Sequence, residues 1–121
     1  MAYDSIGRVF CQILQKNIVF NAKGFYHLRY KPNGTARTVA ERIYKLTLFP
    51  LAVAVIKNAI SIDEERDVLI PESTKKGARK IKAKQIALVA IVGKKKPVAV
   101  RIIVIEFENS LNPIFWSIMK D

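Results

Sequence analysis

One histidine and one arginine are the side chains of this sequence best suited to chemistry on a phosphate. His27 is the only side chain whose ordinary pKa lies near neutrality, so it can accept or donate a proton there. Arg29 and Tyr30 follow it, and nearby cations would lower the pKa of the imidazole and keep it neutral. Arg101 interrupts an apolar run, where a charge must reach a cleft or find a partner. Two interpretations of each stay open: His27 is a general base or an exposed strand residue, and Arg101 clamps a phosphate or pairs with a carboxylate.

Lysines and one serine are further candidates for contact with an anion. Lys82 and Lys84 share one face of a predicted strand, and Lys84 either reaches an anion or pairs with Glu106 across the hairpin. Ser117 either places its hydroxyl on a phosphate or is only a strand residue. Two polar segments are basic patches that bind a phosphate backbone or only keep the protein in solution. These patches contain Lys75, Lys76, Arg79 and Lys80 in the first and residues 94–96 in the second.

The sequence has neither a glycine-rich phosphate loop nor a G-x-S-x-G elbow. One cysteine and one histidine provide no zinc site, so neither a metal nor a cofactor is expected.

The composition favours a polyanionic partner. The chain has 121 residues, of which 21 are Lys or Arg and 10 are Asp or Glu, giving a formal net charge of +11. Such an excess suits a nucleic acid, an acidic protein or an anionic surface, and the alternative is a solvated lysine-rich surface. Half of the residues are hydrophobic, which predicts one ordered domain over 1–121. The single cysteine, the interrupted apolar run 46–56 and the lack of a signal-peptide pattern predict a cytoplasmic protein without membrane contact.

A long hairpin is the element that must position these groups. Two apolar, β-branched runs flank the Gly-Lys-Pro break at 93–97, which predicts paired strands from about 81 to 107. With Val92 and Val98 at the turn, Val89 faces Arg101.

The remaining segments predict an α+β domain in the order α-β-α-α-β-β-β. A helix is expected over 4–15 because apolar residues recur at helical spacing. Thr38 and Glu41 form a capping box that starts a helix near 39, with Val39, Ile43 and Leu46 as its apolar stripe. Pro50 would kink this helix or open a new one. The other expected elements are a strand over 25–31, a helix (or else a strand) over 51–57, an exposed acidic turn within 61–67, a short strand over 68–71 and a last strand or turn over 114–119.

A family resemblance rests on four segments of the chain. They are GFYHLRY at 24–30, RTVAERIYKLTLFPLAVAVIKN at 37–58, the hairpin with its embedded arginine, and the closing IFWSIM at 114–119. The chain resembles the small nuclease domains of phages and mobile elements in the barnase–EndoU–colicin–RelE superfamily. The resemblance covers most of the chain through short, degenerate motifs. It implies an antiparallel sheet of about four strands with two or three helices packed on one face. It also implies a metal-independent, toxin-like ribonuclease that uses the ribose 2′-OH as the nucleophile.

Carried over to this sequence, the resemblance makes His27 the general acid or base. Arg101 and Lys84 stabilise the phosphorane, and Ser117 is the hydroxyl of the closing strand. No carboxylate base of the barnase type stands out, and Tyr26 or Tyr30 is the substitute that RelE-like toxins suggest. The implied nucleic-acid contacts are Arg29, Tyr30, Arg42, Lys45, Lys75, Lys76, Arg79, Lys80 and Lys82. The implied partners are tRNA or mRNA and an acidic antitoxin or immunity protein. A non-catalytic nucleic-acid-binding module and a structural accessory protein are the alternatives.

Overall fold

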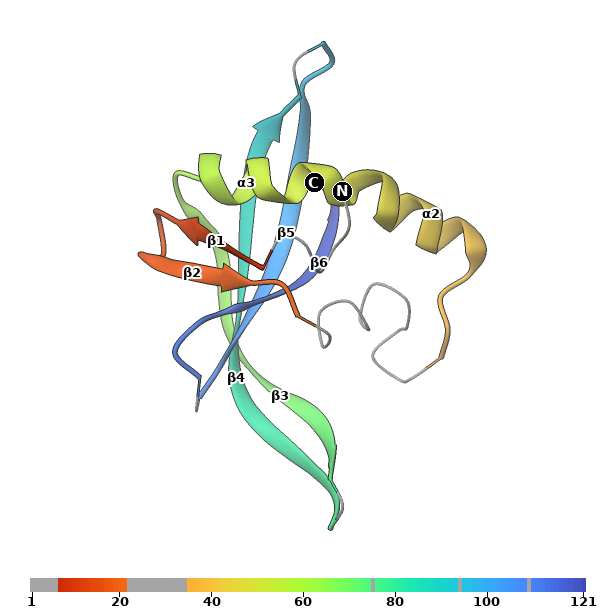
Figure 1. Cartoon of the computed structure of the whole chain (residues 1–121), viewed down its shortest axis with the longest axis vertical. Helices are drawn as coiled ribbons and strands as arrows, with labels where there is room; N and C mark the ends of the chain where they lie inside the picture. The colour runs from red at the N-terminus through yellow and green to blue at the C-terminus, as the bar shows by residue number, and fades with distance from the viewer. Residues whose placement is uncertain (1–6, 22–34, 75, 94, 109) are drawn as a thin grey trace.

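A computed structural model describes residues 7–21, 35–74, 76–93, 95–108 and 110–121, and these form a six-stranded mixed sheet (Figure 1). The strands are β1 (Arg8–Cys11), β2 (Lys16–Val19), β3 (Ile62–Thr74), β4 (Gly77–Val92), β5 (Val98–Phe107) and β6 (Ile114–Lys120). Their order is β1-β2-β6-β5-β4-β3, and every pair is antiparallel except β2 with β6. The prediction of a four-stranded antiparallel sheet with two or three helices is therefore wrong.

The helical part of the described chain is one twenty-residue segment. It comprises α2 (Val39–Leu48), the 3₁₀ turn η2 (Phe49–Leu51) and α3 (Ala52–Asn58). The Thr38 hydroxyl accepts a hydrogen bond from the Glu41 N–H, so the predicted start of this helix is confirmed. Pro50 lies in the 3₁₀ turn between α2 and α3, where its missing N–H interrupts the α-helical hydrogen bonding while the helical path continues. The segment α3 crosses β4 and β5, and α2 reaches beyond them to β6 (Figure 1).

The long hairpin has the predicted register. Val92 pairs with Val98, Val89 with Arg101, and Lys84 with Glu106. Near-continuous apolar residues on both strands fix this register, because a slip by one residue would move the whole apolar set to the other face.

The helix predicted over 4–15 is wrong, because β1 and the turn that leads into β2 occupy the described part of that segment. Val9 and Cys11 are buried while Phe10 is exposed, which is the two-residue period of a strand. Gln15 has a left-handed φ of 55° and closes the turn between the two strands. In so short a segment, the apolar residues fit both a helical and a strand period.

The acidic segment predicted as an exposed turn is part of β3, which is much longer than the strand predicted over 68–71. The strand runs from Ile62 to Thr74 and pairs with β4 along its length. The acidic residues 63–65 and 67 are exposed, and some of them form cross-strand ion pairs, such as Glu65 with Lys84. These pairs offset the low strand propensity of acidic residues.

The main core lies between α3 and the sheet face beneath it. Ala52, Val55 and Ile56 of α3 are fully buried in one cluster with β-branched residues of β5. Phe20, Phe49 and Phe115 extend this cluster, with the rings of Phe20 and Phe115 stacked at 4.8 Å. A second, smaller cluster contains Ala83, Ile105, Phe107 and Ile114.

Candidate nucleic-acid interface

Basic residues gather at a two-stranded ribbon formed by the far ends of β3 and β4. The pairing of β4 with β5 begins at Ala83, whereas β3 and β4 continue as paired strands from Leu69 and Lys82 to Thr74 and Gly77. This ribbon extends away from the rest of the sheet at the lower end of Figure 1. Lys76, Arg79, Lys80 and Lys82 are all exposed on it.

Two of the four ribbon cations, Lys80 and Lys82, are not paired with a carboxylate of the described residues. Arg79 pairs with Glu72 at 3.0 Å. Lys80 and Lys82 form no ion pair with any of the described residues, and their side chains are open to solvent. An exposed ammonium group without a carboxylate partner is free to bind a phosphate.

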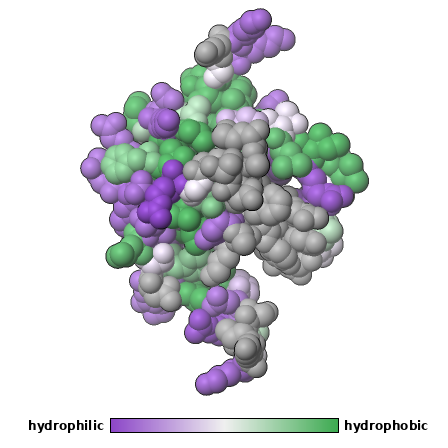
Figure 2. Space-filling view, viewed as in Figure 1, coloured by the Kyte–Doolittle hydropathy of each residue, from purple (hydrophilic) through white to green (hydrophobic). Residues whose placement is uncertain are grey.

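A second basic tip lies at the opposite end of β4. Lys95 and Lys96 are exposed in the turn between β4 and β5 and have no ion pair among the described residues. Gly93 opens this turn with φ of +110°. Figure 2 shows hydrophilic residues at both ends of the long axis of the molecule, with apolar residues concentrated between them.

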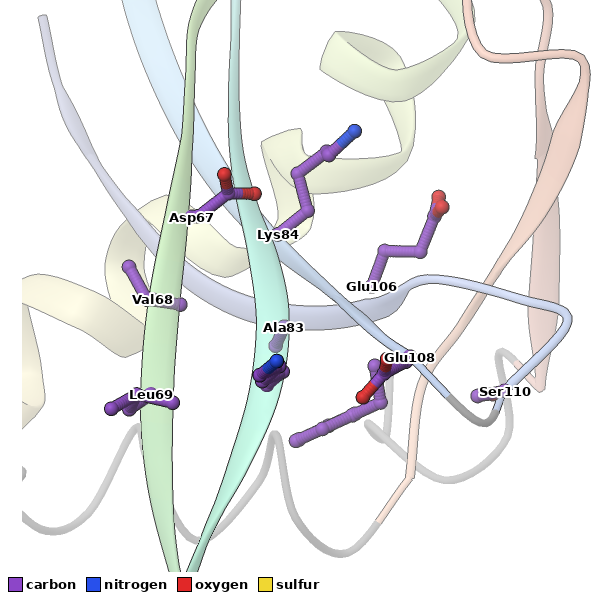
Figure 3. Close-up of a pocket in the computed structure, with 10 residues that line it drawn as sticks. Asp67, Val68, Leu69, Ala83, Lys84, Glu106, Glu108 and Ser110 are labelled. Carbon is purple, nitrogen blue, oxygen red and sulfur yellow. The ribbon is translucent and has the colours of Figure 1, made fainter.

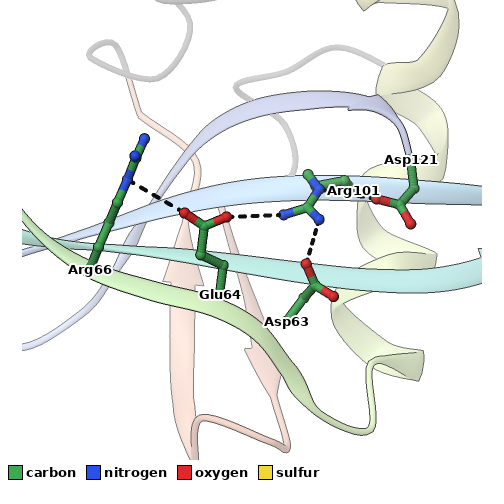
Figure 4. Close-up of polar contacts among 5 residues, drawn as sticks. All are labelled: Asp63, Glu64, Arg66, Arg101 and Asp121. Atoms are coloured by element: carbon green, nitrogen blue, oxygen red, sulfur yellow. Dashed lines mark hydrogen bonds and ion pairs between the residues drawn. The ribbon is translucent and has the colours of Figure 1, made fainter.

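Arg101 is surrounded by carboxylates, which agrees with the ion-pair interpretation of this residue (Figure 4). Its guanidinium donates hydrogen bonds to Asp63 of β3 and to Asp121, the latter at 3.1 Å, and lies 3.9 Å from Glu64. Partial burial opposes the charged form, but the hydrogen bonds to Asp121 and Asp63 raise the pKa of Arg101 overall. A guanidinium with its donors directed at three carboxylates has little capacity left for a phosphate.

Lys84 lies on the other face of the sheet from Arg101. Directly paired residues share a face, so Lys84 faces the same way as Glu106, and Arg101 the same way as Val89. Residues 84 and 89 of one regular strand point to opposite faces. Lys84 pairs with Glu65 at 3.0 Å, and this hydrogen bond raises the pKa of Lys84, while Glu106 pairs with Lys16 at 3.0 Å. The structure thus separates Arg101 and Lys84 instead of bringing them together.

Ser117 and Lys45, predicted for different roles, meet in the interior. The Lys45 ammonium donates to the Ser117 hydroxyl at 2.9 Å and to the Ile118 carbonyl at 2.8 Å. Lys45 is 8% exposed and Ser117 is 5% exposed, so neither can contact a polymer. Burial is the main cause that lowers the pKa of Lys45 to about 8; Arg37 adds to the shift and Glu41 opposes it. No sequence pattern indicated this contact, because it joins a helix to a strand far along the chain.

The contacts of Lys45 are part of a cap on the edge of β6 beyond its single pairing with β2, which is Val19 with Ile114. The Tyr44 hydroxyl accepts a hydrogen bond of 2.8 Å from the Lys120 N–H. The Ile118 carbonyl and the Lys120 N–H are the groups that a neighbouring strand would bind, and side chains of α2 take its place. The predicted apolar stripe of this helix points the other way: Val39 is 62% exposed, and Ile43 and Leu46 are also exposed.

A hollow of about 600 Å³ lies at the root of the ribbon (Figure 3). Asp67, Lys84 and Glu106 project to the same side of three neighbouring strands, and Glu108 and Ser110 lie at its far wall. Lysines and carboxylates both line this hollow, so its charge is mixed.

The remaining predicted site residues have no described role. His27, Arg29, Tyr30 and Lys75 lie outside the described residues. Arg42 is partly buried, and its Nε forms no hydrogen bond within the described part of the chain.

Comparisons of the chain with protein-family models, curated proteins and solved structures found no match. Within the described residues, no cluster of three or more His, Cys, Asp or Glu side chains is placed to hold a metal ion. None of the helices described is long and apolar enough to cross a bilayer. The cytoplasmic location stays a prediction.

Proposed function

We propose that this protein is a nucleic-acid-binding module that holds phosphates with the exposed lysines at the two ends of β4. The observation that carries the proposal is the segregation of charge along the sheet. In its middle, Arg66, Lys84 and Arg101 are each paired with carboxylates of β3. At its ends, Lys80 and Lys82 on one side and Lys95 and Lys96 on the other are exposed and have no such partner among the described residues.

Unpaired surface cations are the groups that gain most from a phosphate backbone. A cation already paired with a carboxylate must lose that partner to bind a phosphate, whereas a free lysine only releases counterions from the nucleic acid. The net charge of +11 adds a long-range attraction that raises the rate of encounter with any polyanion.

The proposal is tested by the salt dependence of binding to fluorescently labelled DNA and RNA. We expect the logarithm of the binding constant to fall linearly with the logarithm of salt concentration, by about 0.9 per duplex phosphate neutralised and about 0.7 per single-strand phosphate. In the variant Lys80→Ser/Lys82→Ser the slope should drop by roughly 1.4–1.8, because two phosphate contacts are lost.

A matched control is Arg8→Ser/Lys57→Ser, which removes the same charge from exposed positions on β1 and α3. Its slope should stay within about 0.5 of the wild-type slope, since a distant charge has only a screened effect. Absence of binding, a flat salt response, or equal losses in the two variants would refute binding through these lysines.

Ribonuclease activity stays a separate prediction, since it depends on His27. Incubation of the same protein with total RNA in the presence of EDTA tests it directly. If wild-type protein cleaves RNA and His27→Ala is slower by about 10²–10⁴-fold, the ribonuclease assignment takes precedence over a simple binding module.

A further inference from the structure

The ribbon has the dimensions of a groove-binding arm. Six residue pairs, from Leu69 with Lys82 to Thr74 with Gly77, extend β3 and β4 beyond their pairing with β5. At about 3.3 Å per residue this arm is roughly 20 Å long. The hydrogen bond from the Glu108 N–H to the Lys82 carbonyl marks its root.

One face of the ribbon combines cations with apolar side chains that remain in solvent. Leu69 and Pro71 lie opposite Lys82 and Lys80 in the register, so the four side chains share a face. All four are exposed, and Leu69 is 56% exposed. The opposite face carries Ile70 and Ile81, which are half-buried against the second core cluster. The solvent face is therefore the one open to a partner.

The chemistry of this face suits the edges of base pairs as well as phosphates. Lysine can bind the O6 and N7 acceptors of guanine in the major groove, and an apolar side chain such as Leu69 can contact the thymine methyl group. The lysines Lys80 and Lys82 are two residues apart, so their side chains follow one another along the strand and can span from a groove wall to its floor.

We infer that the ribbon, with Leu69, Pro71, Lys80 and Lys82 as its contact face, inserts into the major groove of duplex DNA. The groove of B-form DNA is about 12 Å wide and admits a two-stranded ribbon. The major groove of duplex RNA is too deep and narrow to admit one, so the arm selects DNA. This inference rests on the proposed nucleic-acid binding and names the class of nucleic acid.

The test measures binding to four nucleic acids at one salt concentration: a DNA duplex, an RNA duplex of the same sequence, and single-stranded DNA and RNA of that sequence. The full chain should bind the DNA duplex at least about tenfold more tightly than the RNA duplex. Methylation of guanine N7, which blocks the major groove, should weaken binding to DNA.

Two variants with the same net charge show which end of β4 provides the preference for duplex DNA over duplex RNA. The variant Lys80→Ser/Lys82→Ser should lose at least about tenfold in affinity for DNA and lose the preference over RNA. The variant Lys95→Ser/Lys96→Ser, altered at the other tip, should keep the preference even if both affinities fall. Both pairs of lysines are exposed, so circular dichroism and melting temperature should match the wild type.

Failure of the inference differs from failure of the proposed function. Binding that is equal for all four nucleic acids, tighter for RNA, or insensitive to N7 methylation would overturn insertion of the ribbon into the major groove, while the proposed nucleic-acid binding would stand. A loss of preference in the Lys95→Ser/Lys96→Ser variant alone would also overturn it. Absence of any binding would overturn both.

Discussion

The side-chain amine of Lys45 lies 2.9 Å from the hydroxyl oxygen of Ser117, although 72 residues separate them in the chain. The same amine donates to the Ile118 carbonyl, so one buried lysine connects α2 to the edge of β6 through two hydrogen bonds. Both acceptors are uncharged, and within the described residues the Lys45 ammonium group forms no ion pair with a carboxylate. The fold therefore contains a cation whose neutral form is favoured by burial.

Stability should rise with pH as Lys45 loses its proton. The pKa of Lys45 is about 8 in the folded protein and about 10.4 in an unfolded chain, so between these values the unfolded state binds more protons. The free energy of unfolding is then flat below pH 8 and increases by roughly 2–3 kcal/mol up to about pH 10.4. Urea unfolding at pH 7, 8.5 and 10 measures this rise.

Two variants separate this effect from the general loss of positive charge. Lys45→Met should show a smaller rise than the wild type, because the buried titrating group is gone. Lys57→Met, which removes an exposed lysine, should keep the full rise. Identical pH profiles for the wild type and Lys45→Met would show that Lys45 does not titrate in this window.

Removing the cap on β6 should make the protein associate with itself. In Tyr44→Phe/Lys45→Met, the Ile118 carbonyl and the Lys120 N–H lose their side-chain partners. An exposed strand edge with unpaired groups binds another strand, so we expect concentration-dependent dimers or larger species in analytical ultracentrifugation. Tyr44→Phe alone keeps Lys45 and should remain in the wild-type state; a double variant that also does so would contradict the capping role.

Replacement of Arg101 should affect stability more than binding. Arg101→Met leaves Asp63, Glu64 and Asp121 close together without their shared cation, and loss of charged hydrogen bonds costs about 1–3 kcal/mol. Asp63→Asn should lower the free energy of unfolding less in the Arg101→Met variant than in the wild type, since the two side chains act as a pair. Denaturant unfolding measures both. If Arg101→Met keeps wild-type stability but loses DNA binding or RNA cleavage, Arg101 contacts a phosphate instead.

The turn between β4 and β5 should tolerate only glycine at position 93. Gly93 has φ of +110°, and a Cβ there would lie 2.9 Å from the Lys96 carbonyl oxygen. Gly93→Ala should cost on the order of 1–3 kcal/mol through backbone strain and this clash. Gly77 has φ of +118° with open space around it, so Gly77→Ala should cost less. Equal unfolding free energies for the two variants would argue against the steric contribution.

Local signals account for the parts of the fold that could be predicted. The hairpin of β4 and β5 was predictable because both strands are apolar at nearly every position, and the Thr38–Glu41 box located the start of α2. Both signals lie within a few residues of the structure that they specify.

The misplaced parts depend on contacts between distant segments. The strands β1 and β2 are too short for their apolar residues to distinguish a strand from a helix. The orientation of α2 depends on the need of β6 for edge partners, which buries Lys45 and exposes the apolar residues that were expected to face the core. At the candidate site, the basic residues of the ribbon were named from composition, but its extension beyond β5 follows only from the register.

The parallel contact between β2 and β6 also constrains the order in which the protein can fold. Val19 pairs with Ile114 and donates its N–H to the Pro113 carbonyl, so the sheet joins an early and a late segment of the chain. During synthesis, the three-stranded meander of β3, β4 and β5 can form while the ribosome still holds residue 114. The hairpin of β1 and β2 can join the sheet only through β6, and the closure of so long a loop makes this joining a late, entropically costly step.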